Sequence, residues 1–157
     1  MNAIKEPDAC DLLDADHLAV KHLFVDYARQ ATAAPMEPGD RQALAGRICE
    51  ELTVHAQIEE EIFYPALRQA LGEPALLDEA QAEHRQAKEL IARIQGLQAP
   101  DPAMDDLVSE LARVIEHHVK EERDMLFTKA RAAPGLDLQA LRDQLKARQE
   151  ELAGQPA

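Results

Sequence analysis

Two histidine–glutamate pairs with identical spacing are the residues of this sequence best suited to chemistry. His55 precedes Glu59 by four residues, and His118 precedes Glu122 by the same interval. On a helix this spacing places both side chains on one face, one turn apart. Imidazole nitrogen and carboxylate oxygen form a ligand set that suits iron, manganese or zinc. The repeated spacing therefore predicts a metal site.

Both pairs interrupt stripes of apolar residues at helical spacing, and two further histidines do the same. Such a stripe marks the side of a helix that faces the core. The stripes comprise Ile48, Leu52, His55, Glu59 and Ile62; Leu107, Leu111, Val114, His118, Glu122 and Met125; Leu13, His17, Val20 and Phe24; and Leu77, Ala80, His84, Ala87 and Ile91. Burying a carboxylate without compensation is strongly unfavourable. A bound metal ion is the economical compensation for Glu59 and Glu122.

The heights of these residues along four antiparallel helices predict a dinuclear site. The residues expected within about two helical turns of one level are His17, His55, Glu59, His84, His118 and Glu122. One glutamate from each pair is then available to bridge two ions about 3.5–4 Å apart. Two ions therefore fit the six ligands better than one.

A glutamate four residues after a histidine also arises by chance in a chain rich in glutamate, as a solvated surface pair. His117 with Glu121 is predicted to be such a pair, because His117 is turned by about 100° from His118. His22 is turned by about 140° from His17 and is also predicted to lie outside the metal shell. The other glutamates beside the two inward pairs are predicted to be solvated. The metal prediction depends on the whole combination.

Proline and glycine clusters divide the sequence into the helices that must position these residues. The predicted helices cover residues 8–34, 38–71, 74–98 and 102–132, with a tail helix over residues 137–152. Short connections favour antiparallel neighbours, so we predict an all-α, up-down-up-down four-helix bundle with a short C-terminal helix, forming one domain over residues 1–157. Pro65 is predicted to kink the second helix or to end it early.

Composition supports this class and excludes several partners. Hydrophobic residues make up 46% of the 157 residues and aromatic residues only 3%, which is typical of packed helices. The formal charge of −13 disfavours a nucleic-acid partner. With no leader and no apolar run of about 20 residues, we expect a cytoplasmic protein without a membrane partner. Cys10 and Cys49 are predicted to lie about 30 Å apart and to be unpaired.

The sequence resembles the hemerythrin-like, HHE cation-binding domains of bacteria from about Asp8 to Ala132. The matching segments are LLDADHLAVKHLF around His17, HAQIEEEIFYPAL from His55, EHRQAKELI around His84 and HHVKEERDMLF through His118. This resemblance implies a non-haem di-iron centre with bridging carboxylates and the same six ligands. Oxygen-carrying hemerythrins have a further histidine where this chain has Lys88. The set of four histidines and two glutamates is closer to members linked with nitric oxide, oxidative stress and iron–sulfur repair.

The leading functional interpretation is a di-iron protein that binds or senses a diatomic ligand, oxygen or nitric oxide, or responds to oxidative or nitrosative stress. Six protein ligands leave coordination positions open on two ions, so a small molecule has access. An enzyme that reduces nitric oxide or peroxide, a protein for iron storage or delivery, and a structural zinc site are the alternatives. Zinc or manganese is a substitute for iron in this ligand set. Whether the protein has a protein partner is left open by the sequence.

Overall fold

The computed structural model describes residues 6–32, 38–97 and 102–154, and every regular element in these ranges is helical. The first and third long helices are α1 (Ala9–Thr32) and α4 (Pro74–Gln95). The second consists of α2 (Pro38–Ile58), a π-helical turn η1 (Glu59–Phe63) and α3 (Tyr64–Leu71). The fourth consists of α5 (Ala103–Glu121), a π-helical turn η2 (Glu122–Phe127) and α6 (Thr128–Ala132). The C-terminal helix is α7 (Leu138–Ala153).

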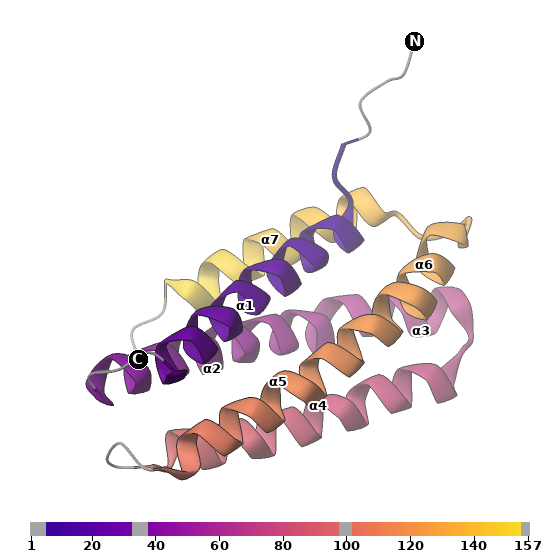
Figure 1. The fold of residues 1–157 in the computed structure, drawn as a ribbon. Coiled ribbons are helices and arrows are strands. Elements are labelled where there is room, and N and C mark those ends of the chain that lie inside the picture. Colours follow the sequence, from indigo (N-terminus) through magenta and orange to yellow (C-terminus); the bar gives the residue numbers. More distant parts are fainter. Residues whose placement is uncertain (1–5, 33–37, 98–101, 155–157) are drawn as a thin grey trace.

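These helices form an antiparallel four-helix bundle, and α7 lies along α1 and α2 (Figure 1). The predicted all-α class and architecture are thus confirmed. The predicted helix ends agree with the structure to within a few residues, except that residues 33, 34 and 98 lie outside the described part of the chain. Leu141 and Leu145 of α7 are buried, so the C-terminal helix covers apolar surface.

Local hydrogen bonds fix several helix ends. At the start of α1 the backbone N–H of Asp8 donates to Asp11 Oδ2, and the N–H of Asp11 donates to Asp8 Oδ1, each at 2.9 Å. This reciprocal arrangement satisfies donors that a helix N-terminus leaves free. Asp137 caps α7 by accepting from the N–H of Ala140. Gly72 ends α3 in the left-handed conformation, with φ of 60°.

The two π-helical turns occupy equivalent places, since each begins at the glutamate of an H-x-x-x-E pair. η1 begins at Glu59 and ends at Phe63, two residues before Pro65, where the sequence predicted a kink or an early end. The helix does not end early but continues into α3 through this wider turn. η2 begins at Glu122 and contains no proline. The π turns therefore coincide with the two glutamates and not with a proline. Such turns occur frequently at functional sites.

The π turns also correct the predicted apolar stripes. An α-helical period places Ile62 and Met125, three residues after each glutamate, in the core. Ile62 is only partly buried and Met125 is 45% exposed. The residues four positions after the glutamates, Phe63 and Leu126, are buried instead. The wider turn adds one residue to the local period, so every later side chain is rotated relative to the α-helical expectation.

The apolar core consists of two clusters, one on each side of a polar layer. On each long helix, a histidine lies between a residue of one cluster and a residue of the other. The flanking pairs are Val20 and Leu13, Leu52 and Ile58, Ala87 and Ala80, and Val114 and Leu126. The bundle therefore buries a polar layer between two apolar halves.

In the half of the bundle that holds Val20 and Val114, a polar group separate from the polar layer links three helices. The Tyr27 hydroxyl of α1 donates to Asp105 Oδ1 of α5 at 2.6 Å, and Arg41 of α2 donates to Asp105 Oδ2 at 3.0 Å.

Cys10 and Cys49 are both buried, and they are unpaired as predicted. Within the described ranges, no helix is both long and apolar enough to cross a membrane.

Candidate metal centre

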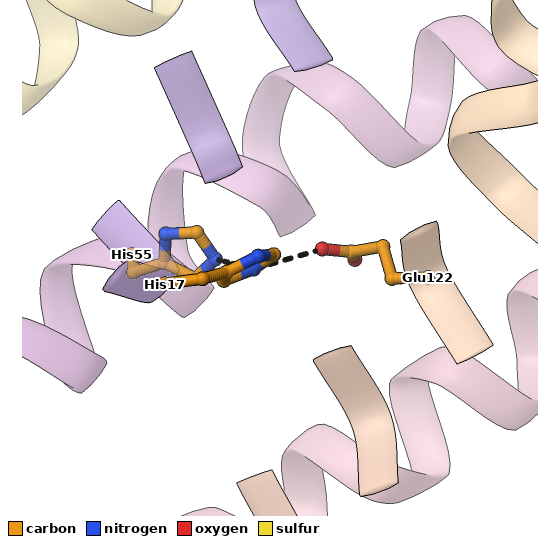
Figure 2. A group of neighbouring side chains, drawn as sticks. All are labelled: His17, His55 and Glu122. Carbon is orange, nitrogen blue, oxygen red and sulfur yellow. Dashed lines mark hydrogen bonds and ion pairs between the residues drawn. The ribbon is translucent and has the colours of Figure 1, made fainter. Parts of the chain in front are cut away.

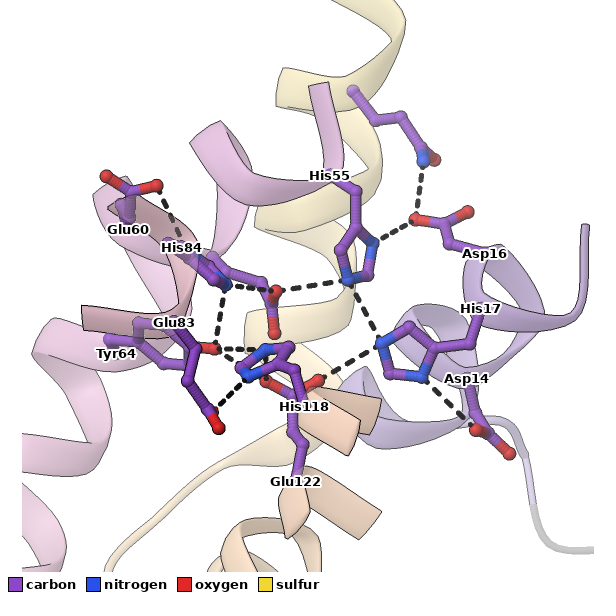
Figure 3. Close-up of polar contacts among 12 residues, drawn as sticks. Asp14, Asp16, His17, His55, Glu60, Tyr64, Glu83, His84, His118 and Glu122 are labelled. Atoms are coloured by element: carbon purple, nitrogen blue, oxygen red, sulfur yellow. Dashed lines mark hydrogen bonds and ion pairs between the residues drawn. The ribbon is translucent and has the colours of Figure 1, made fainter. Parts of the chain in front are cut away.

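The polar layer contains all six predicted ligands, which come from the four long helices. Figure 3 labels His17, His55, His84, His118 and Glu122 among them. Glu59 and Glu122 are 0% and 1% exposed, and the other four side chains are almost as deeply buried. His22 lies exposed on α1, and the His117 side chain is 66% exposed on α5. Helix geometry therefore separated inward from outward histidines correctly.

The six residues form two groups of three, each with two histidines and one glutamate. The first group is His17, His55 and Glu122 (Figure 2), and the second is Glu59, His84 and His118. Within each group the candidate ligand atoms lie within 4.8 Å of one another. Each group resembles the three protein ligands of a metal site that keeps an open position.

Glu59 belongs to the second group but also contacts the first. Its Oε1 lies 3.0 Å from His55 Nε2 and 3.3 Å from His84 Nε2. Neither of its carboxylate oxygens accepts a hydrogen bond, although both are fully buried. A buried carboxylate in this condition requires a cation or a proton beside it. From this position between the two groups, one carboxylate can reach ligand atoms of both.

Glu122 shows the same arrangement in reverse. Its Oε1 lies 3.1 Å from His17 Nε2 in the first group, and its Oε2 lies 3.3 Å from His118 Nε2 in the second. Oε1 accepts no hydrogen bond, whereas Oε2 accepts one from the Tyr64 hydroxyl at 2.6 Å. Both glutamates therefore span the two groups.

The outer nitrogen of every inward histidine contacts a carboxylate. The partners of Nδ1 are Asp14 for His17 at 3.4 Å, Asp16 for His55 at 3.1 Å, Glu60 for His84 at 3.0 Å and Glu83 for His118 at 2.8 Å. A carboxylate keeps the proton of a neutral imidazole on Nδ1 and leaves the Nε2 lone pair directed inward. Neutral rings would thus have facing lone pairs on His17 Nε2 and His55 Nε2, only 3.1 Å apart. A proton or a metal ion must lie between such atoms.

The chain matches the family model described as "Hemerythrin HHE cation binding domain" over residues 8–130. It belongs to this family. A crystal structure of a hemerythrin HHE domain-containing protein from Mycobacterium kansasii superposes with a TM-score of 0.76 at 26% identity, covering 95% of this chain and 89% of that one. The resemblance noted in the sequence is thereby confirmed.

Curated relatives include proteins of different lengths. An uncharacterised protein of Mycobacterium tuberculosis is 31% identical over 151 residues, covering 95% of this chain and 89% of its own. A protein of a Nostoc species named DNA nickase is 31% identical over 121 residues, which cover 77% of this chain. The match spans only 33% of that longer protein. The shared part is therefore the HHE domain.

When no metal is present, the neighbouring carboxylates hold protons tightly on two histidines of the site. Burial lowers the pKa of His55, but Glu59 and Asp16 outweigh burial and raise that pKa to about 10. Burial opposes the charged form of His118 as well, yet Glu122 and Glu83 raise its pKa to about 11. Burial alone raises the pKa of Glu122, whereas the His118 ring beside it holds that pKa well below the usual range. Metal binding must displace these protons.

Tyr64 is a residue of the site that sequence reasoning missed. Besides its bond to Glu122, its hydroxyl lies 3.2 Å from His84 Nε2 and 3.3 Å from His118 Nε2. Tyr64 follows Glu59 by five residues, which in an α-helix turns it away by about 140°. The π turn closes i to i+5 contacts and brings it back over Glu59. The aromatic residue five positions after the glutamate is the only sequence signal for it.

The carboxylates around the histidines were also missed as a set. Glu60, predicted to be solvated, pairs with His84 and with Lys88. Glu83 precedes His84 in sequence, yet it contacts His118 on the neighbouring helix. It also faces His117, which forms a surface cluster with it and with Glu121. Contacts of this kind join two helices, so no spacing pattern in the sequence predicts them.

A small cavity of about 30 Å³ lies against the histidine side of the site. All four inward histidines border it, together with the apolar side chains Val20, Leu52, Ala56, Ala87, Ile91, Ile115 and Val119. The exposed lining residues Thr53 and Lys88 mark its opening between α2 and α4. A volume of this size holds about two water molecules. The cavity therefore has room for only a very small molecule.

Proposed function

We propose that the six residues bind two iron ions and that the cavity admits a small oxygen or nitrogen species to them. The observation that carries this proposal is the double contact of each glutamate, since Glu59 and Glu122 both reach histidines of both groups. Two carboxylates shared by two ions are the arrangement of dinuclear centres in helical bundles. A single ion would leave one group of three uncompensated.

The donor set favours iron over a structural zinc ion. Structural zinc sites are closed and four-coordinate, usually with cysteine ligands. Cys10 and Cys49 take no part, because both are buried in the apolar clusters. Imidazole, carboxylate and the nearby Tyr64 hydroxyl supply nitrogen and oxygen donors that suit iron and manganese. Iron supplies reversible redox chemistry and binding of small molecules at its open positions.

The cavity supports a small ligand because it contacts the histidine side and has apolar walls. Oxygen and nitric oxide are neutral and fit such a space, so binding or sensing is the leading function. The second candidate is turnover of peroxide, which Tyr64 favours because it places an O–H group beside His84 and His118. Burial and Glu122 raise the pKa of Tyr64 well above its usual value, so this hydroxyl keeps its proton. It therefore holds a hydrogen bond to Glu122 in the resting site.

The test begins with anaerobic loading with ferrous iron and a count of iron per chain, for which we expect two. The loaded protein is then exposed separately to nitric oxide, oxygen and peroxide while absorption and electron paramagnetic resonance spectra are recorded. A stable adduct supports binding, and repeated consumption of peroxide supports turnover. One iron per chain would contradict the dinuclear site, and an unchanged spectrum with all three would contradict the small-molecule function.

A cavity variant separates ligand access from iron binding. Ala87→Leu fills the cavity from α4 and should slow the spectral response to nitric oxide while two irons remain bound. Ala92→Leu places the same substitution on the exposed side of α4 and serves as the control. Equal rates of response in both variants would show that the ligand does not enter through this cavity.

A further inference from the structure

The last turns of α7 contact the polar layer as well as the apolar core. Leu141 and Leu145 account for the packing of the first half of the helix. Further along, Gln149 Nε2 donates to Asp16 Oδ2 of α1 at 2.9 Å. Arg148 donates to Glu61 Oε2 of η1 at 2.8 Å. Apolar burial by α7 does not require either contact.

The Gln149 contact leads directly to a histidine of the site. The oxygen of Asp16 that accepts from Gln149 is the same Oδ2 that lies 3.1 Å from His55 Nδ1. Two consecutive contacts thus link Gln149 through Asp16 to Nδ1 of His55. The other ring nitrogen of His55, Nε2, faces into the site. The Asp16 side chain is 22% exposed, so water competes for its oxygens unless a second partner holds it.

Each outer carboxylate has a second partner of this kind. Asp14 pairs with Arg123 at 3.2 Å, Glu60 with Lys88 at 2.7 Å, and Glu83 with His117 at 3.5 Å. These three partners all belong to the four long helices of the bundle. Asp16 is held by Gln149 of α7, which is a neutral donor from outside the bundle. The neutral amide orients the carboxylate without offsetting its charge toward His55.

We propose that Gln149 is a positioning residue of the metal centre, through which α7 fixes Asp16 against His55. This inference rests on the proposed role of His55 as a metal ligand. Gln149 does not touch the metal position itself. Its amide restricts Asp16 to the orientation that keeps the Nδ1 proton in place and directs the Nε2 lone pair of His55 inward.

The test measures the affinity of the full chain for Co²⁺ by competition with a chelator, with the visible spectrum of the bound ion as the readout. Loss of a residue that orients a metal ligand typically lowers metal affinity by about 10- to 100-fold, which we expect for Asp16→Ala. Gln149→Leu acts one step further out, and we expect a decrease of about 3- to 10-fold. Gln144→Leu makes the same change on the exposed side of α7 and should leave the affinity unchanged.

A double variant distinguishes positioning from general packing of α7. If Gln149 acts through Asp16, adding Gln149→Leu to Asp16→Ala lowers Co²⁺ affinity no further than Asp16→Ala alone. In the Zn²⁺-bound protein, where the Nε2 of a ligating ring is occupied by metal, the ¹⁵N shift of His55 Nδ1 should change in Gln149→Leu and stay unchanged in Gln144→Leu.

Two results would overturn the proposal. One is equal Co²⁺ affinity in Gln149→Leu and Gln144→Leu, and the other is a multiplicative loss in the double variant. His55→Ala tests the underlying ligand assignment separately. Full Co²⁺ affinity in His55→Ala would refute the ligand role of His55, whereas a loss there with no effect of Gln149→Leu would refute only the positioning role.

Discussion

Replacing Glu122 with glutamine removes one buried negative charge while preserving the shape of the side chain. Glu122 is 1% exposed, and its oxygens contact His17, His118 and Tyr64. In its proposed bridging role Glu122 offers one bond to each of two ions, so its loss is expected to weaken both metal positions. We expect Glu122→Gln to retain less than about half of the iron bound by the parent protein.

The same substitution should destabilise the protein when no metal is bound. Breaking a buried ion pair by removing one partner costs about 3–5 kcal/mol. The lower end applies because His118 can release its proton once the Glu122 charge is gone, which leaves about 3 kcal/mol. For a chain of this size each kcal/mol lowers the melting temperature by about 2–4 °C, so we expect a decrease of about 6–12 °C.

Glu121→Gln is the matched control, since it makes the same change at the adjacent position. The Glu121 side chain is 32% exposed, and burial together with the Glu83 charge raises its pKa. Removing its charge should therefore change stability by no more than about 0.5 kcal/mol. Iron per chain by mass spectrometry and thermal unfolding by circular dichroism are measured for both variants. Equal iron retention in the two variants would refute the bridging role of Glu122.

Three further predictions concern the metal-free protein. Because the pKa values of His55 and His118 are raised to about 10 and about 11, their ion pairs stabilise the fold fully below about pH 6.5 and are lost as the pH rises through those values. The melting temperature should accordingly fall between pH 7 and pH 10, while zinc affinity rises over the same range. Tyr64→Phe removes the donor to Glu122 and should lower the free energy of unfolding by about 1–2 kcal/mol in urea titrations. Asp105→Ala leaves the tyrosine hydroxyl of α1 without its acceptor and should cost about 1 kcal/mol in the same assay.

Each of these has an outcome that contradicts it. A melting temperature that is constant or rises from pH 7 to pH 10 would show that the buried histidines are neutral. A Tyr64→Phe variant as stable as the parent would show that its hydroxyl bond to Glu122 contributes nothing net. If Asp105→Ala is as stable as the parent, the polar group that joins α1, α2 and α5 contributes nothing net to stability.

The sequence predicted the features that depend on local spacing. The interval between His55 and Glu59 on one helix fixes their common face, and the apolar residues around His17 and His84 fix the direction of those rings. Proline and glycine clusters determine where helices can begin and end. The six converging side chains could therefore be found without coordinates, and the exposed positions of His22 and His117 follow from the same periodicity.

The π turns could not be predicted in this way. An α-helical period placed Ile62 and Met125 in the core, whereas the structure buries Phe63 and Leu126 and brings Tyr64 into the site. Intrinsic propensity does not favour a π turn, because π-helical hydrogen bonding is rare. Such a turn persists where tertiary packing around a buried group outweighs the local preference. Its location is therefore decided by the site and not by the segment's own sequence.

Sequence alone determined which residues face inward and at what level, because that follows from the period of a single helix. Only the tertiary structure decided how they are shared, with Glu59 reaching His55 and His84 and each histidine backed by its own carboxylate. Glu59 with His55 and Asp14 with His17 follow from spacing on one helix. The other contacts join different helices, and their geometry depends on helix rotation and spacing that no interval along the chain encodes. The link from Gln149 to Asp16 spans 133 positions and exists because α7 packs back onto α1.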